Sequence, residues 1–381
     1  MDRFGSFNPI PSSSSTSALI SRTLPKINSF DEMEVLGALN NLMTELSLAT
    51  DVFGENANVK DLITALCNTL DRFPSLPDIA TAALNCLNYL VDINPGLTSS
   101  IVRCGGTKMI CNKLLNVENF EAVEVAIKLL EKMSNENMVS LLEAKCFIYI
   151  LQFVDFFDLN LRKTMLKCCL NITKGIISYD EIEKYIQEGI PFLITLMRLD
   201  GTSDIEKNIC DLAIQNLYYI LNCAKRFIVM SENKIKDLCQ MIQDAGVIDN
   251  LFELFLNYFN AKNNNKIIEP TVSIIGADTV NMILKVFESL CEIEGTIVDS
   301  LLEKGMLEYI YQVLFNEIDK MGDIIIVTLK DVSFSMPKSF DKTNIIKSII
   351  YVGIMLLSYF FAFHEKKLAK YFAILTKCYN F

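Results

Sequence analysis

The stretches ALNCLNYLVD (83–92) and IVRCGGTKMICNKLL (101–115) decide the fold of this chain. They read as a long apolar helix, then a short helix that ends in a small or turn residue, then another apolar helix. The long-helix pattern recurs as AIKLLEKMSN (126–135), MLKCCLNITK (165–174), AIQNLYYILN (213–222) and ILKVFESLCE (283–292). The short-helix pattern recurs as LLEAKCFIYILQFV (141–154), IQEGIPFLITLM (186–197), IQDAGVIDNLFELF (242–255) and LLEKGMLEYIYQVLF (301–315). No copy can bury its apolar face alone, so successive copies are expected to stack.

The spacing of the copies indicates the type of repeat. Their junctions fall at Gly106, Lys145, Gly189, Gly246 and Gly305. The first two steps suit the unit of about 40–47 residues that is typical of armadillo and HEAT repeats, and the later steps need insertions such as AKNNNKIIEPTVSIIGAD (261–278). Glycine at a helix end favours a left-handed turn, which we expect at these junctions. We therefore predict an all-α fold, an armadillo/HEAT-type right-handed helical solenoid, over residues 31–315.

The segments outside the repeats differ in composition. Residues 1–30 contain PSSSSTS (11–17) and are predicted to be a disordered, Ser-rich tail. Residues 316–344 read as an irregular linker, and 345–381 as an apolar C-terminal helix. Within the latter, IIKSIIYVGIMLLSYFFAF (345–363) is compatible with a membrane anchor, with a buried terminal helix, or with non-coding sequence read as protein. A membrane anchor is not the favoured interpretation, because Lys347 interrupts the apolar run.

Charge and motif content argue against several function classes. With 46 acidic and 35 basic residues the net charge is −11, which disfavours nucleic acid as a partner. The twelve cysteines include no C-x-x-C pair, and most sit in apolar helical runs, so we expect thiols of the core of a cytoplasmic or nuclear protein. The single histidine, His364, lies outside the repeats. No phosphate-binding, dinucleotide-binding or metalloprotease motif occurs, so we expect no catalytic residue, cofactor or metal.

Two fragments match the armadillo signature, EGIPFLITLM (188–197) and AALNCLNYL (82–90). More specifically, FPSLPDIATAALNCLNYLVDINPGLTSSIVRCGGTKMICNKLLNVENFEAVEVAIKLLEKMS (73–134) and LLEAKCFIYILQFVDFFDLNLRKTMLKCCLNITKGI (141–176) resemble the N-terminal armadillo region of HECT-type E3 ubiquitin ligases. These ligases are those of the ubiquitin-fusion-degradation, thyroid-receptor-interacting and Kaktus class. The resemblance covers roughly residues 35–315. It implies the binding part of a ligase without its catalytic HECT domain, and TKCYN (376–380) does not make Cys378 a nucleophile.

The resemblance implies a non-catalytic scaffold that recruits protein or peptide substrates, some of them ubiquitin-fused, in the ubiquitin–proteasome pathway. We expect the groove to follow the third helix of each repeat, near 78–92, 120–134, 160–175, 204–223 and 277–292. Its candidate polar residues are Asn85, Asn88, Lys132, Asn171, Asn216 and Asn222. Amide side chains can bond both N–H and C=O of an extended peptide, although the same amides could instead cap or solvate helices.

Other functions stay open at this stage. The chain could be a membrane-tethered adaptor, or a general cytosolic armadillo adaptor unrelated to ubiquitin. A nuclear-import receptor is disfavoured, because such grooves pair asparagine with tryptophan and this chain has no tryptophan. An enzyme in its own right is disfavoured because no acid–base grouping can be named.

Overall fold

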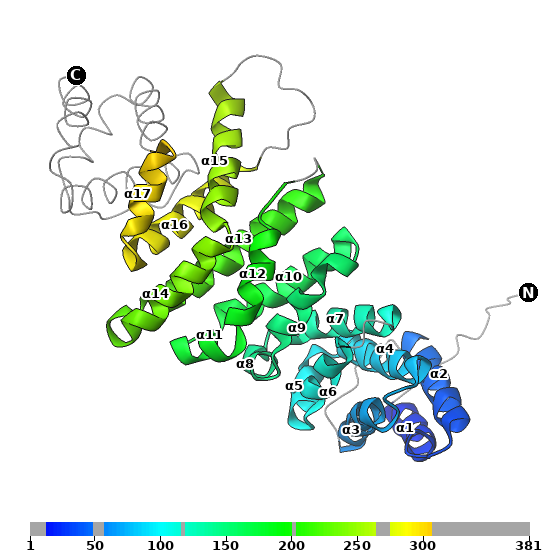
Figure 1. Ribbon diagram of the computed structural model, residues 1–381. Coiled ribbons are helices and arrows are strands. Elements are labelled where there is room, and N and C mark those ends of the chain that lie inside the picture. The colour runs from blue at the N-terminus through cyan, green and yellow to red at the C-terminus, as the bar shows by residue number, and fades with distance from the viewer. Residues whose placement is uncertain (1–12, 49–56, 116–118, 200–202, 264–274, 307–381) are drawn as a thin grey trace, which may run out of the picture. The chain divides into compact units, whose positions relative to one another are not determined.

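A computed structural model of the protein describes residues 13–48, 57–115, 119–199, 203–263 and 275–306 (Figure 1). Every regular element in these ranges is an α-helix or a short 3-10 helix, and the ranges contain no strand. The chain divides into two units, Met1–Ile176 and Ile177–Phe381. Within each unit the helices stack as successive repeats, which confirms the predicted all-α solenoid. The predictions for 316–344 and 345–381 lie outside the described residues.

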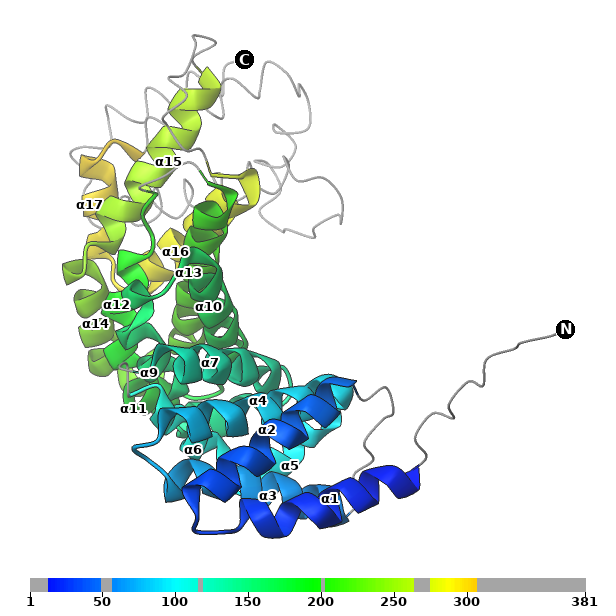
Figure 2. The ribbon, with the colours of Figure 1, turned by 90° about the vertical axis from the view of Figure 1, so that its right-hand side faces the viewer.

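Unit 1 contains ten α-helices in its described part. They are α1 (Ser13–Ile27), α2 (Glu32–Leu48), α3 (Ala57–Arg72), α4 (Pro77–Ile93), α5 (Thr98–Arg103), α6 (Gly106–Lys113), α7 (Phe120–Ser134), α8 (Met138–Glu143), α9 (Cys146–Gln152) and α10 (Leu159–Lys174). The long helices α4, α7 and α10 are the third helices of successive repeats. They pack in sequence, α4 against α7 and α7 against α10 (Figure 2).

Unit 2 repeats the arrangement in its described part. Its helices are α11 (Tyr179–Tyr185), α12 (Ile190–Thr195), α13 (Asp204–Lys225), α14 (Ile228–Asp244), α15 (Val247–Asn263), α16 (Ala277–Ile293) and α17 (Thr296–Glu303). Here α13 and α16 are the third helices, and they pack against each other. Helix α14 is kinked at Ser231, whose φ of −138° and ψ of 37° are not helical.

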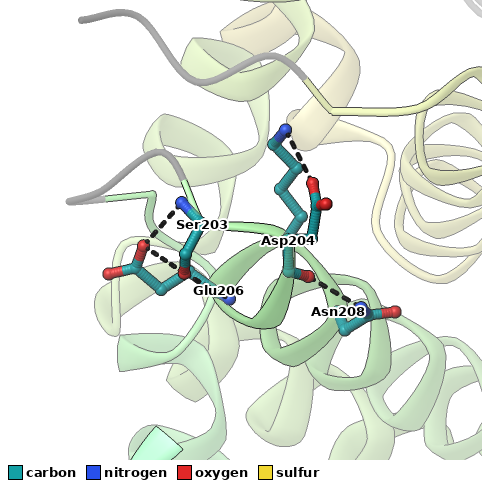
Figure 3. A network of polar contacts seen from close by, with 5 residues as sticks. Ser203, Asp204, Glu206 and Asn208 are labelled. Carbon is teal, nitrogen blue, oxygen red and sulfur yellow. Dashed lines mark hydrogen bonds and ion pairs between the residues drawn. The ribbon is translucent and has the colours of Figure 1, made fainter.

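Short polar sequences determine where α13 and α2 begin. At α13, the Ser203 side chain accepts a hydrogen bond from the backbone N–H of Glu206, and the Glu206 carboxylate accepts one from the backbone N–H of Ser203 at 3.1 Å (Figure 3). This reciprocal capping box satisfies two N–H groups that the helix itself leaves unpaired. At α2, a carboxylate oxygen of Asp31 accepts from the N–H of Met33 at 2.9 Å. Acidic caps of this kind also complement the helix dipole.

Helix α1 lies within the segment that composition predicts to be a disordered tail. Ile20 is 1% exposed and Ile27 is fully buried, because α1 packs against α2 and α3. The Arg72 guanidinium on α3 donates a hydrogen bond to the carbonyl of Ile27 and so ties down the end of α1. A disordered tail therefore does not describe Ser13–Ile27. The segment is rich in serine, but Ile20 and Ile27 form an apolar face that α2 and α3 cover.

The junction residues follow the prediction in part. Gly246 and Gly305 have φ of 83° and 84°, in the left-handed region, and Lys145 also adopts it with φ 57°. In the first repeat the left-handed residue is Gly105, whose φ is 77°, and Gly106 is the first residue of the next helix. Gly189 has a φ of −85°, which is outside the left-handed region, so the prediction of a left-handed residue there is wrong. There a 3-10 turn leads directly into a helix that carries proline in its first turn, where proline needs no left-handed residue before it.

The core of each unit is apolar and includes most of the described cysteines. Ten of the eleven free thiols in the described residues are buried, and Cys104 is half-buried. Burial raises the pKa of Cys86, Cys210 and Cys291 to about 12, so these side chains act as small hydrophobic groups. Their small size allows neighbouring helices to approach closely.

Gly106 and Gly37 offer a matched test of the packing. In Gly106→Ala the new Cβ would lie 2.5 Å from Sγ of Cys67 and 3.0 Å from the carbonyl oxygen of Ile101. We expect this change to lower the free energy of unfolding of unit 1 by about 1–3 kcal/mol. In Gly37→Ala, inside α2, the new Cβ meets nothing within 4 Å. This variant should gain about 0.5–1 kcal/mol from helix propensity.

Urea denaturation followed by circular dichroism measures both variants. A Gly106→Ala protein as stable as the parent would contradict the close approach of α3 to the start of α6.

Candidate partner-binding surface

Each third helix of unit 1 leaves one stripe of side chains half-buried or exposed. The stripes are Asn85, Tyr89 and Asp92 on α4, Glu124, Lys128 and Glu131 on α7, and Lys163, Lys167 and Asn171 on α10. The residues of each stripe are spaced by about one helical turn, so they share a face. Because α4, α7 and α10 pack in sequence, we treat the three stripes as one surface, the unit 1 ridge.

Lys132 joins α7 to α4 along this ridge. Its Nζ donates a hydrogen bond to Oδ1 of Asn88 at 2.7 Å and lies 2.7 Å from a carboxylate oxygen of Asp92. The Asn88 amide in turn donates to the carbonyl of Val125, at 3.4 Å. Asn88 is only 9% exposed. The prediction that Asn88 faces a partner is therefore wrong: its polar atoms hold two repeats together.

Asn171 and Asn85 occupy different positions on the ridge. The Asn171 amide donates to Oγ of Ser134 at 2.9 Å and to Oδ1 of Asn135 at 3.1 Å, so it also links neighbouring third helices. Asn85 is half-buried, and no hydrogen bond to its side chain occurs within the described residues. Asn85 therefore remains able to bond a partner, and Tyr89, one turn further along α4, adds an exposed aromatic ring beside it.

In unit 2 the two predicted asparagines have different surroundings. Asn216 is fully buried, and its amide donates to the carbonyl of Leu212 on the same helix at 2.8 Å. It does not line a surface, because the face of α13 that carries it packs inward. Asn222 is half-buried and shares a stripe of α13 with Gln215 and Tyr218.

The structure adds contacts between α13 and α16 that sequence patterns did not indicate. The Nζ of Lys285 lies 5.7 Å from the ring centroid of Tyr218, a cation–π contact. Lys225 pairs with Glu292, and the Thr279 hydroxyl donates to a carboxylate oxygen of Asp211 at 3.2 Å. The partners are more than sixty residues apart, so no local sequence signal could have paired them. Together these side chains form a second polar surface, the unit 2 ridge.

Charge is unevenly distributed over the unit 1 ridge. On α7, Glu124 and Lys128 pair at 2.6 Å and largely neutralise each other. On α10, Lys163 and Lys167 form no ion pair with any residue of the described ranges. This end of the ridge is therefore basic although the whole chain is acidic, and it would attract an acidic segment of a partner.

The described part of the chain shows little that points to catalysis. It holds no cluster of three or more His, Cys, Asp or Glu side chains that could bind a metal ion. None of its helices reaches the length and hydropathy that crossing a bilayer requires. A cavity of about 470 Å³ in unit 1 is lined by Pro74, Ser75, Pro77, Ala80, Lys113, Asn119 and Ala122. Its one titratable group is Lys113, whose pKa is lowered by burial, so the cavity lacks an acid–base pair.

Stacked helical repeats with an open polar ridge define an armadillo-like repeat protein. Residues 12–143 match the family described as "E3 ubiquitin-protein ligase TRIP12-like, TPR repeats". The chain is 26% identical over 176 residues to "E3 ubiquitin-protein ligase UPL3" of Arabidopsis thaliana, a match that covers 46% of this chain and 9% of the relative. It is 25% identical over 171 residues to "E3 ubiquitin-protein ligase UPL4" of the same plant, covering 45% of this chain and 11% of the relative. The resemblance to the N-terminal repeat region of HECT-type ligases is thereby confirmed.

A further relative is a "Probable ubiquitin fusion degradation protein" of Schizosaccharomyces pombe, 19% identical over 231 residues, or 60% of this chain and 12% of the relative. The chain thus spans about a tenth of the length of the curated relatives it matches. Among solved structures, a designed armadillo repeat protein in complex with the peptide (KR)4 aligns with a TM-score of 0.46 and 17% identity. That alignment covers 71% of this chain and 99% of the designed one.

Alanine substitutions at Asn88 and Asn85 show which of the two amides stabilises the fold. Asn88→Ala should cost about 1–2 kcal/mol of unfolding free energy, because it leaves the ammonium of Lys132 with one partner fewer in a half-buried site. Asn85→Ala, on the same helix, should change it by less than about 0.5 kcal/mol. Both are measured by urea denaturation. Equal costs at the two positions would show that Asn88 does not join the repeats.

We predict that the stability of unit 2 depends on pH through the carboxyl group of Asp211. Burial raises its pKa above the ordinary value, although hydrogen bonds from Thr279 and Gln215 oppose the rise. The native state then binds this proton more tightly than the unfolded state, so its contribution to stability is present at low pH and is lost as pH rises through the raised pKa. Asp211→Asn removes the titration. The free energy of unfolding of the variant should exceed that of the parent at pH 7, and the difference should be smaller at pH 4. Urea denaturation at both pH values measures it. A difference independent of pH would contradict this.

Proposed function

We propose that the chain is a non-catalytic interaction scaffold whose unit 1 ridge docks protein segments and recruits substrates in the ubiquitin–proteasome pathway. The observation that carries this proposal is the ridge itself. The half-buried Asn85 and the exposed Tyr89 lie one turn apart on α4, and the half-buried Lys163 and the exposed Lys167 lie one turn apart on α10. An extended polypeptide crossing the three packed helices would meet an amide and an aromatic ring at one end and two ammonium groups at the other.

The pathway is supported by the relatives and not by the ridge. The matched family and both plant relatives are described as E3 ubiquitin-protein ligases. The fungal relative is described as a ubiquitin fusion degradation protein. We infer by similarity that the partners include substrates carrying a linear ubiquitin fusion. We also propose a location in the cytoplasm or nucleus, which agrees with the buried free thiols of the core.

The proposal is tested by measuring binding of the purified full chain to a non-cleavable linear ubiquitin fusion and to the same protein without ubiquitin. We expect the fusion to bind. The double variant Lys163→Glu/Lys167→Glu should weaken binding about tenfold or more, since it reverses two charges at the basic end of the ridge.

The matched control is Lys60→Glu/Lys108→Glu, which makes the same charge change on exposed positions of α3 and α6, away from the ridge. Its affinity should equal that of the parent. If the parent does not distinguish the fusion from the unfused protein, the ubiquitin role fails. If both double variants weaken binding equally, the ridge is not the docking surface.

A further inference from the structure

Two thiols of unit 1 lie close together at the turn between α5 and α6. Cys67 is fully buried on α3, and Cys104 is the half-buried residue that follows α5. The thiol of Cys104 donates a hydrogen bond to the carbonyl oxygen of Ile101 at 3.2 Å. A Cβ on Gly106 would lie 3.0 Å from that same oxygen and 2.5 Å from the sulfur of Cys67, so both sulfurs lie around one carbonyl. There the Cys67 thiol interacts with the sulfur of Cys104 as donor. The turn Cys104–Gly106 thus holds both sulfurs, and glycine at 106 leaves the space that Cys67 needs.

The surroundings give the two thiols different chemistry. The hydrogen bond from Cys67 lowers the pKa of Cys104 to about 7, and the backbone N–H groups of Gly106 and Cys104 add to the effect against the opposing influence of burial. The same contact, with burial, raises the pKa of Cys67. Near neutral pH, Cys104 is therefore partly ionised and supplies the nucleophilic thiolate, whereas Cys67 keeps its proton.

The other thiols of unit 1 show why accessibility matters. Cys146 also contacts two thiols, those of Cys111 and Cys168, but all three side chains are fully buried. Burial raises the pKa of Cys146 well above its ordinary value. A solute in water reaches none of them. Among the cysteines that the structure describes, Cys104 alone combines exposure with a neighbouring thiol.

We propose that Cys67 and Cys104 form an oxidation site that reacts with a hydroperoxide and closes to a disulfide. The Cys104 thiolate attacks one peroxide oxygen, the O–O bond breaks, and the departing hydroxide takes a proton to become water. The Cys67 thiol then gives up its proton and attacks the Cys104 sulfur. The S–S bond forms, the S–O bond of the sulfenic acid breaks, and the hydroxide leaves as water with that proton. Two thiols are oxidised by two electrons, and one hydrogen peroxide is reduced to two waters.

The bond would link the repeat that contains α3 to the repeat that begins with α5. These helices already pack against each other, as do α3 and α6, so closure ties an existing contact. A cross-link between residues distant in the chain restricts the unfolded state. The oxidised protein should therefore resist urea more than the reduced protein, and a thiol reductant should reverse the change.

The test uses the full chain, reduced and then treated with about one equivalent of hydrogen peroxide at pH 7. Remaining thiols are alkylated, and the digest is mapped by mass spectrometry. We expect the dominant product to join the peptides of Cys67 and Cys104, with loss of two hydrogens. In Cys67→Ala, which cannot close the bond, dimedone should trap a sulfenic acid at Cys104. Cys111→Ala, a matched change at another buried thiol, should form the same disulfide as the parent.

A second measurement needs no variant. The rate at which iodoacetamide alkylates Cys104 in the reduced protein should rise through pH about 7, below the value of about 8.5 for an ordinary thiol. Oxidation that leaves Cys67 and Cys104 unlinked, or that joins either to a different cysteine first, would overturn the proposal. So would alkylation of Cys104 with the pH profile of an ordinary thiol.

Discussion

Lateral packing of third helices is the interaction on which each unit depends. In unit 1, α4 is covered by α2 on one side and α7 on the other, and α7 is covered in turn by α10. Leu87 and Leu130 are fully buried at these contacts. A single repeat exposes this apolar area, so its helices become stable only when the next repeat covers them. The remaining properties of the surface follow from which faces this packing leaves open.

The packing also decides how polar residues are used. Amides near the line where two third helices meet are drawn into contacts between repeats, as Asn88 is with Lys132 and Asn171 is with Ser134. Such contacts satisfy polar atoms that stacking would otherwise bury without partners. Residues one turn away, such as Asn85 and Tyr89, stay open. The surface that we propose for a partner is thus the part of each third helix that stacking does not use.

Cysteine shows the same division between stacking and exposure. Most of the described thiols are buried and serve as small apolar groups where helices approach closely. Cys104 differs because it follows the short helix α5 at the turn before α6, where the chain comes to the surface. At this turn between two helices of one repeat, the same residue type is half-buried and is not enclosed in the core. The left-handed Gly105 and the crowded Gly106 make that turn possible.

Apolar periodicity by itself determined the class of fold and the approximate place of the third helices. Segments expected near 120–134 and 277–292 correspond to α7 and α16, since a continuous helical stripe is a local property of the chain. Tertiary structure alone decided three other features: the burial of α1, the loss of Asn88 and Asn216 from the surface, and the meeting of Cys67 with Cys104. Each depends on the register between helices that are distant in the sequence. A local pattern states which residues share a helix face, but not which atom of a neighbouring helix that face will meet.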